Sequence, residues 1–142
     1  MSQKNPFASN TEITWCPGCG NFGILMALKA ALLEIGATPE NTLVVFGIGC
    51  SGNMVNWVNS YGFHSLHGRT LPVATGALFA NHELLVIAEG GDGDGYGIGL
   101  AHFIHACRRN VDILYLVHNN QIYGLTTGQT SPTSDKGFVT QS

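Results

Sequence analysis

Asp92 and Asn120 carry the strongest chemical signal in the sequence. Asp92 lies in the glycine-rich stretch 90–95, directly after an apolar segment, and Asn120 follows the next apolar segment, 28 residues later. In a β-α-β unit this spacing returns the chain to the neighbouring strand, so both side chains are expected at the carboxyl edge of a parallel sheet, where open α/β folds bind ligands. A carboxylate and an amide oxygen are hard ligands that suit Mg²⁺ carrying a diphosphate. The alternative is a pair of turn-forming residues, but the glycine density and the strand-end position favour the metal site.

Three cysteines in loop-like sequence form a second candidate site. Cys16 and Cys19 have the spacing that places two thiolates on one metal, and Cys50 follows 31 residues after Cys19 in another glycine-rich stretch. This pattern is compatible with a redox pair, a partial zinc site or an iron–sulfur cluster, and three thiolates do not complete a shell of four ligands. Cys107 lies inside a predicted helix, where we expect a buried core cysteine.

Residues 47–52 match the GxGxxG pattern that often binds dinucleotides after a strand. A dinucleotide site also needs an acidic residue about 20 positions later, and no acidic residue occurs between Glu40 and Glu83. The pattern therefore argues against a nicotinamide dinucleotide, although the backbone N–H groups remain suited to another anion. His64, His67 and Arg69 follow in the same connection, as a candidate phosphate pocket or as an ordinary polar loop.

The order of the predicted elements indicates the fold class. Helices and strands alternate as β-α-β-α-β, which favours an α/β fold with a parallel sheet flanked by helices. We expect one domain over residues 1–142, with an irregular arm at 1–14 and a loop-like tail at 121–142. One face of the first helix collects its apolar residues, which are Ile24, Leu25, Leu28, Ala31, Leu32 and Ile35. The predicted elements are helix 21–35, strand 42–46, loop 47–69, helix 72–80, strand 84–88, helix 98–109 and strand 112–117.

The composition narrows the class of partners. Only 11% of the 142 residues are charged, about half the usual ~25% of soluble domains, so we expect another subunit to cover much of the surface. A net charge of −3 gives no reason to expect nucleic acid or a membrane surface, and no apolar run reaches the ~18 residues of a membrane span. The N-terminus has no signal-peptide pattern, which predicts a cytoplasmic protein with reduced cysteines.

The motifs in their order resemble a known family. Stretches 15–20, 47–51, 61–63, 67–69, 90–95 and 120–126 together resemble the beta subunit of 2-oxoacid:ferredoxin oxidoreductases, with the 2-oxoglutarate branch most similar. Within them, the GDG at 91–93 and the pair at 119–120 resemble the thiamine diphosphate motif. The resemblance covers residues 13–137 and implies a thiamine diphosphate-binding fold.

The resemblance also implies a role for individual residues. Mg²⁺ would be ligated by Asp92 and Asn120 through their side chains and by Ile122 through its backbone oxygen. A [4Fe–4S] cluster would be bound by Cys16, Cys19 and Cys50. Thiamine diphosphate would be held by the backbone of Ile48, Gly49, Gly93, Asp94, Gly124 and Leu125, together with Ser51 and His67.

The implied reaction is the oxidative decarboxylation of a 2-oxoacid, 2-oxoglutarate or pyruvate, to acyl-coenzyme A and CO₂. The thiamine cofactor carries the chemistry, and electrons pass singly through the cluster to ferredoxin. In such enzymes the carboxylate that activates the cofactor comes from the alpha subunit, which agrees with the lack of a convincing proton-transfer residue in this sequence.

One departure from the family affects the cluster. The family's fourth cluster cysteine lies beyond the position of Ser142, and Cys107 does not match it. We therefore expect a domain that is incomplete at its C-terminus. Two alternatives stay open, namely a cluster-free thiamine diphosphate decarboxylase or acyl transferase, and a non-catalytic cofactor-binding or assembly module.

Overall fold

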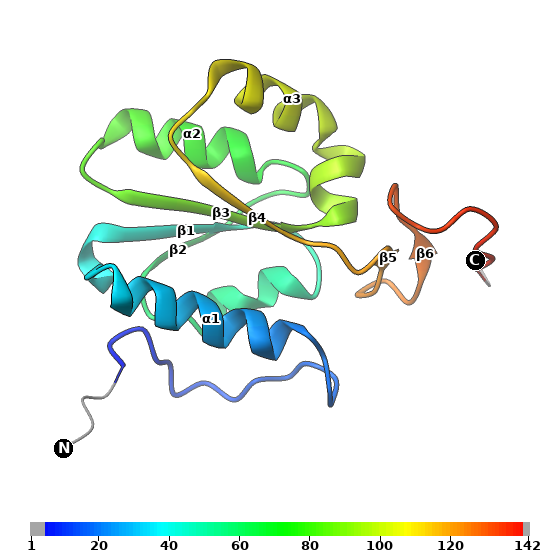
Figure 1. Cartoon of the computed structure of the whole chain (residues 1–142), viewed down its shortest axis with the longest axis horizontal. Helices are drawn as coiled ribbons and strands as arrows, with labels where there is room; N and C mark the ends of the chain where they lie inside the picture. Colours follow the sequence, from blue (N-terminus) through cyan, green and yellow to red (C-terminus); the bar gives the residue numbers. More distant parts are fainter. Residues whose placement is uncertain (1–4, 141–142) are drawn as a thin grey trace.

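A parallel sheet of four strands forms the centre of the molecule (Figure 1). The computed structural model describes residues 5–140. The strands are β1 (Thr42–Phe46), β2 (Tyr61–His64), β3 (Leu85–Gly91) and β4 (Leu114–His118), in the spatial order β2-β1-β3-β4. The chain passes from β1 outward to β2 and then returns to the other side of β1, so the strand order reverses between β1 and β3. Such a reversal point opens a crevice at the carboxyl ends of the two strands.

Helices cover both faces of the sheet (Figure 1). Helices α2 (Thr70–Ala80) and α3 (Leu100–Arg109) lie on one face, and α1 (Asn21–Glu34) lies on the other with the 3₁₀ helix η2 (Ser51–Asn56). A short 3₁₀ turn, η1 (Pro39–Asn41), leads into β1. This arrangement confirms the predicted fold class. Within residues 5–140, none of the helices combines the length and the hydropathy needed to traverse a lipid bilayer.

Alternation along the strands divides the core into two layers. Val44 and Phe46 point toward α1, whereas Val45 packs with α2, because successive strand side chains point to opposite faces. The layer under α1 is built on three leucines of that helix, Leu25, Leu28 and Leu32. The prediction of a wider apolar face was wrong, since Ile24, Ala31 and Ile35 are exposed. These residues lie beside the leucine stripe or, for Ile35, at the position where the helix ends.

The N-terminal arm is firmly packed from residue 5 onward. Phe7 is completely buried, and its carbonyl accepts a hydrogen bond from the N–H of Asn59 at 3.0 Å. The indole Nε1 of Trp57 donates to the carbonyl of Glu12 at 2.9 Å. The predicted arm begins with residues 1–4, which lie outside the described residues.

Two segments predicted as loops contain strands. The connection 47–69 includes η2 and the edge strand β2, which pairs in parallel with β1 from Leu43 opposite Tyr61 onward. All four β2 side chains are exposed, so the segment lacks the apolar signal of a buried strand. The tail at 121–142 contains a short antiparallel pair, β5 (Ile122–Tyr123) and β6 (Gln129–Thr130).

Several predicted boundaries shift. Strand β3 continues through Gly91, so the first two residues of the expected glycine loop are strand, and a π-helical turn, η3 (Gly93–Ile98), comes before α3. Helix α2 begins two residues earlier than predicted, and β4 two residues later. The prediction that Cys107 is a buried core residue was wrong, since its side chain is exposed and α3 buries none of its residues completely.

A carboxyl group interrupts the apolar face of β3. Glu89 lies on the α1 side with Ile87 and is completely buried. Its Oε1 lies 3.3 Å from Nε2 of His118 at the end of β4. Burial raises the pKa of Glu89 to about 8, a contact with the Ser51 hydroxyl acts in the opposite direction, and the Asp94 carboxylate adds a smaller rise. Burial also lowers the pKa of His118 to about 4. Both shifts favour the uncharged forms of these side chains.

Replacing Leu25 with Ala should destabilise the fold by about 2–5 kcal/mol, because the change leaves a cavity under α1. The matched control is Met26→Ala on the next residue of the same helix, which is 68% exposed and should change stability by less than about 0.5 kcal/mol. Urea denaturation measures both. Equal losses in the two variants would contradict the assigned orientation of α1.

Replacing Glu89 with Gln should remove a pH dependence of stability. The folded-state pKa of about 8 exceeds the ordinary value of 4.5, so between these values the folded protein binds more protons than the unfolded chain. The contribution of Glu89 is complete below pH 4.5 and is lost as the pH rises through 8. Relative to Glu89→Gln, the wild-type free energy of unfolding should fall with rising pH, by at most about 1.4 kcal/mol per pH unit. Urea titrations of both proteins from pH 5 to 9 test this, and parallel curves would contradict it.

Candidate functional site

The carboxyl ends of the four strands open into one cavity with about 610 Å³ of space between its walls and mouth. Its walls come from the segments after β1, β2, β3 and β4, together with the start of α1. The structure brings together all residues predicted to hold the cofactor and magnesium. These are Ile48, Gly49, Ser51, His67, Gly93, Asp94, Gly124 and Leu125 for the cofactor, and Asp92, Asn120 and Ile122 for the ion.

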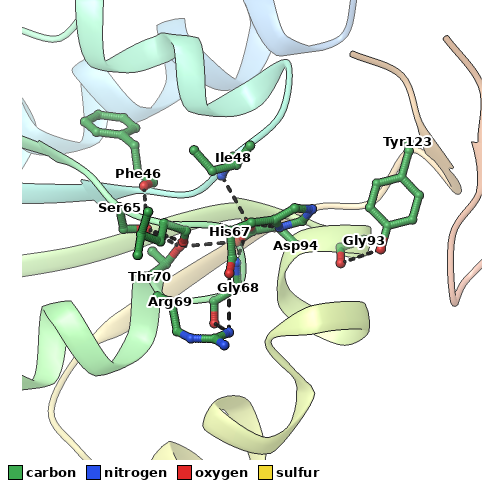
Figure 2. A network of polar contacts seen from close by, with 11 residues as sticks. Phe46, Ile48, Ser65, His67, Gly68, Arg69, Thr70, Gly93, Asp94 and Tyr123 are labelled. Carbon is green, nitrogen blue, oxygen red and sulfur yellow. Dashed lines mark hydrogen bonds and ion pairs between the residues drawn. The ribbon is translucent and has the colours of Figure 1, made fainter. Parts of the chain in front are cut away.

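The buried carboxylate of Asp94 joins the loops that form the cavity (Figure 2). Its Oδ1 accepts hydrogen bonds from the backbone N–H of Ile48 at 3.1 Å, from the N–H of Gly68 at 2.8 Å and from Nδ1 of His67 at 2.7 Å. Its Oδ2 accepts one from the Thr70 hydroxyl at 3.3 Å. The side chain of Asp94 therefore holds the segments after β1 and β2 against the turn after β3, a role that the sequence did not reveal.

His67 is oriented by this carboxylate. Because Oδ1 of Asp94 can only accept, Nδ1 of His67 carries the hydrogen, and Nε2 is left for a ligand in the cavity. The ring of Tyr123 lies edge-on to His67 with 6.0 Å between ring centroids, and its hydroxyl donates to the carbonyl of Gly93 at 2.9 Å. Burial, followed by the charges of Asp92 and Asp94, raises the pKa of the Tyr123 hydroxyl. Tyr123 is a further wall residue that the motif did not single out.

Two of the three glycines of the GxGxxG pattern, Gly47 and Gly52, serve packing. A side chain at Gly47 would clash with the carboxylate of Asp94, and one at Gly52 would clash with the carbonyl of Gly47. The helix that follows is the short 3₁₀ segment η2, in place of the α-helix of a dinucleotide fingerprint. Both observations agree with the expectation that this pattern is not a dinucleotide site.

Asp92 is 1% exposed and is held by the tail. Its Oδ2 accepts hydrogen bonds from the hydroxyls of Ser131 and Thr133, each at 2.5 Å, and its Oδ1 accepts one from the N–H of Asn120 at 3.4 Å. The Oδ1 of Asn120 accepts from the N–H of Ile122 at 3.1 Å. The two hydroxyls were missed from the sequence, where their only signal is a Ser- and Thr-rich tail.

Of the three cysteines predicted for the cluster, one reaches the cavity. Cys50 lines it, while Cys16 is exposed and Cys19 is half-buried. The indole of Trp15 donates to the carbonyl of Cys50 at 2.6 Å and thereby attaches the first cysteine loop to the loop after β1. Burial raises the pKa of the Cys50 thiol, and the nearby Cys19 and Cys16 raise it further. Among residues 5–140, no three His, Cys, Asp or Glu side chains form a ready-made metal site, so the cluster and the magnesium site stay predictions.

Three polar side chains, Glu89, His118 and Asn21, lie in a row that runs from the buried end of β3 to the cavity wall. His118 lines the cavity and pairs with Glu89 on one side, while its Nδ1 lies 2.9 Å from Oδ1 of Asn21 on the other. Asn21 is the first residue of α1 and also lines the cavity. Sequence reasoning missed all three residues. The available signal was an acidic residue at the end of an otherwise apolar strand.

Comparisons with known proteins agree with this geometry. The chain is 49% identical over 139 residues to "2-oxoacid:ferredoxin oxidoreductase 1, subunit beta" of Aeropyrum pernix, covering 96% of this chain and 44% of that protein. It is 53% identical over 130 residues to the corresponding beta subunit of Saccharolobus solfataricus, covering 90% and 43%. It is 48% identical over 136 residues to "2-oxoglutarate oxidoreductase subunit KorB" of Mycobacterium tuberculosis, covering 96% and 36%. The chain thus spans less than half the length of these relatives.

A solved structure shares the fold. It is a 2-oxoglutarate:ferredoxin oxidoreductase from Magnetococcus marinus, described with 2-oxoglutarate, coenzyme A and succinyl-CoA bound. The TM-score is 0.89 at 47% sequence identity, and the match covers 94% of this chain and 47% of the other.

The match to a protein family includes most of the cavity. Residues 47–142 match the family described as thiamine pyrophosphate enzyme, C-terminal TPP binding domain. This range includes the segments after all four strands, and hence every residue predicted to hold the cofactor or magnesium. The chain therefore belongs to the family of thiamine pyrophosphate enzymes, through their C-terminal TPP-binding domain.

Proposed function

We propose that the chain is the cofactor-binding part of the beta subunit of a 2-oxoacid:ferredoxin oxidoreductase. With an alpha subunit, in a cytoplasmic complex, it would convert a 2-oxoacid and coenzyme A to acyl-coenzyme A and CO₂ and pass electrons to ferredoxin. The observation that carries this proposal is the single cavity that collects the predicted cofactor residues beside Cys50. The 2-oxoglutarate bound in the similar Magnetococcus marinus structure favours that substrate over pyruvate.

The oxygen ligands fit magnesium. Asp92 is a buried carboxylate whose hydrogen-bond donors are neutral groups, and among residues 5–140 it forms no ion pair with a basic side chain. A buried negative charge without a partner is unfavourable, and a bound cation relieves it. Together with the side chain of Asn120 and the backbone oxygen of Ile122, Asp92 would offer Mg²⁺ three oxygen ligands, the type of ligand it prefers.

The backbone of the cavity fits a diphosphate. In the described part of the chain, the N–H groups of Gly49, Gly124 and Leu125 make no hydrogen bond. Free N–H groups beside glycines form concave sites that attract anions. Ile48 has a different role, because its N–H already donates to Asp94, so it would contact the cofactor through other atoms.

Thiamine diphosphate, when bound, supplies the nucleophilic carbon and the electron sink that decarboxylation of a 2-oxoacid requires. The residues of this chain would bind and orient the reactants. His67, fixed by Asp94, presents Nε2 to the cavity, and Ser51 lies in the wall between Cys50 and the buried Glu89. No carboxylate of this chain is assigned to activate the cofactor, a role we propose for the alpha subunit.

Three thiols fit an iron–sulfur cluster in their chemistry. Thiolates are soft ligands that select such clusters, and Trp15 keeps the loop of Cys16 and Cys19 close to Cys50. Because Cys50 also lines the cavity, a cluster on these residues would lie beside the cofactor. The fourth ligand would come from outside residues 1–142.

Replacing Asp92 with Asn should weaken Mg²⁺-dependent binding of thiamine diphosphate by more than about 100-fold, since changes in the outer shell of a metal alone cost 10–100-fold. The matched control, Asp112→Asn, makes the same change at an exposed position and should leave binding unchanged. Titration calorimetry with thiamine diphosphate, with and without Mg²⁺, measures the effect. Binding that does not depend on Mg²⁺, or equal affinities of the two variants, would contradict the proposed ion site.

Purified with its alpha subunit, the chain should reduce a viologen dye only when a 2-oxoacid and coenzyme A are both present. Cys19→Ser should abolish dye reduction and the iron absorbance but keep thiamine diphosphate binding, whereas Cys107→Ser, at an exposed position, should change none of these. A wild-type complex without iron that still decarboxylates 2-oxoacids would instead support the cluster-free alternative. Failure to bind thiamine diphosphate at all would overturn the proposed function.

A further inference from the structure

Gly93 and Gly97 lie four residues apart in the π-helical turn η3 and face the same aromatic side chain. A Cβ atom at Gly93 would clash with ring carbons of Tyr123, and one at Gly97 would clash with its hydroxyl oxygen. Because protein interiors are closely packed, a side chain at either position would displace the ring. The two glycines therefore form a slot that receives Tyr123.

Tyr123 is held at both ends. Its carbonyl oxygen accepts a hydrogen bond from the N–H of Gly128 at 3.0 Å, within the β5–β6 pair. Its hydroxyl donates to the carbonyl oxygen of Gly93 at 2.9 Å, as Figure 2 shows, and its ring packs edge-on to His67. Tyr123 therefore connects the segment after β4 to the turn after β3.

The contact between Tyr123 and Gly93 lies directly beside two proposed ion ligands. Gly93 follows Asp92 in the sequence, and Tyr123 follows Ile122. Since consecutive Cα atoms are only about 3.8 Å apart, the position of the ring against Gly93 constrains both ligands. A displacement of the ring would move the carboxylate of Asp92 and the backbone oxygen of Ile122 relative to each other.

We propose that Tyr123 is a positioning residue that fixes the spacing of Asp92 and Ile122 and thereby makes the site selective for Mg²⁺ over the larger Ca²⁺. This selectivity rests on the proposed function, because it requires the proposed ion site. Mg²⁺ demands near-ideal octahedral geometry with ligands at about 2.0–2.1 Å, whereas Ca²⁺ accepts irregular geometry at about 2.3–2.6 Å. A fixed spacing therefore favours Mg²⁺, and a loosened one lets the two segments adjust to Ca²⁺.

A role of Tyr123 in packing alone makes a different prediction. In that case, loss of the hydroxyl would lower the stability of the fold and would weaken ligand binding with both ions by the same factor. The ratio of the affinities measured in Mg²⁺ and in Ca²⁺ therefore separates the two roles. Phe at position 123 is the suitable change, because it keeps the ring in the slot and removes only the hydrogen bond to Gly93.

The first test is titration calorimetry of the chain with thiamine diphosphate, in Mg²⁺ and separately in Ca²⁺. Tyr123→Phe should weaken binding about tenfold in Mg²⁺, as is usual for an outer-shell change, but less than about threefold in Ca²⁺. The preference of wild type for Mg²⁺ should therefore fall by at least about threefold. The matched control is Tyr96→Phe, the same change in the same turn at a ring that packs against Phe103, and it should alter neither affinity.

The second test is a rescue experiment on the slot. A Cβ at position 97 meets the Tyr123 hydroxyl, and the next nearest atom is Cγ of Pro132 at 3.5 Å, which is ordinary contact. Gly97→Ala should therefore weaken binding in Mg²⁺ more than Tyr123→Phe does, and adding Tyr123→Phe should restore the affinity to that of Tyr123→Phe alone. Gly76→Ala makes the same change in α2, where a Cβ meets no atom within 4 Å, and should leave binding unchanged.

Three results would overturn the proposal while leaving the proposed function intact. The first is a wild-type chain that binds thiamine diphosphate equally well with either ion. The second is an equal loss with both ions, or no loss, in Tyr123→Phe. The third is a double variant that binds no better than Gly97→Ala alone. If wild type binds no thiamine diphosphate with either ion, the proposed function and the ion selectivity fail together.

Discussion

The carboxylate of Asp94 is the interaction on which the arrangement of the cavity depends. Parallel strand pairing places the loops after the strands at the same carboxyl edge of the sheet. It does not by itself bring those loops into contact with one another. Asp94 does so by accepting four hydrogen bonds, two from backbone N–H groups and two from side chains, and residues 24 to 46 positions away in sequence supply them. Hydrogen bonds to a charged acceptor are stronger than neutral ones, which suits a group that must hold several flexible segments.

Two acidic residues in one glycine stretch thus have separate tasks. Asp94 turns inward to the protein, where its acceptor capacity is used by the loops, whereas Asp92 faces the cavity and interacts only with neutral donors. The glycines around them make this division possible, since a side chain at Gly47 or Gly90 would occupy the space that the Asp94 carboxylate needs. The motif therefore encodes a scaffold and the proposed ligand site within three residues.

The parts of the molecule that were predictable are those with a local signal. Strand β1 is buried on both faces and could be read from its apolar run, and Asp92 and Asn120 stand at strand ends that the spacing revealed. Strand β2 was missed because its side chains are exposed and its order in the sheet is set by long-range pairing. The hydroxyls on Asp92 and the partners of Glu89 were missed for the same reason, since they meet across 29 to 41 positions of sequence.

The hydrogen bonds from Ser131 and Thr133 to Asp92 affect how the proposed site would bind an ion. The two hydroxyls hold the carboxylate in one rotamer, so the protein itself orients the oxygen that would meet an ion. A preorganised ligand loses little conformational entropy on binding. The same hydrogen bonds couple ion binding to the position of the tail that carries Ser131 and Thr133. If this tail moved away from the cavity, the Asp92 carboxylate would lose both hydrogen bonds and become free to rotate.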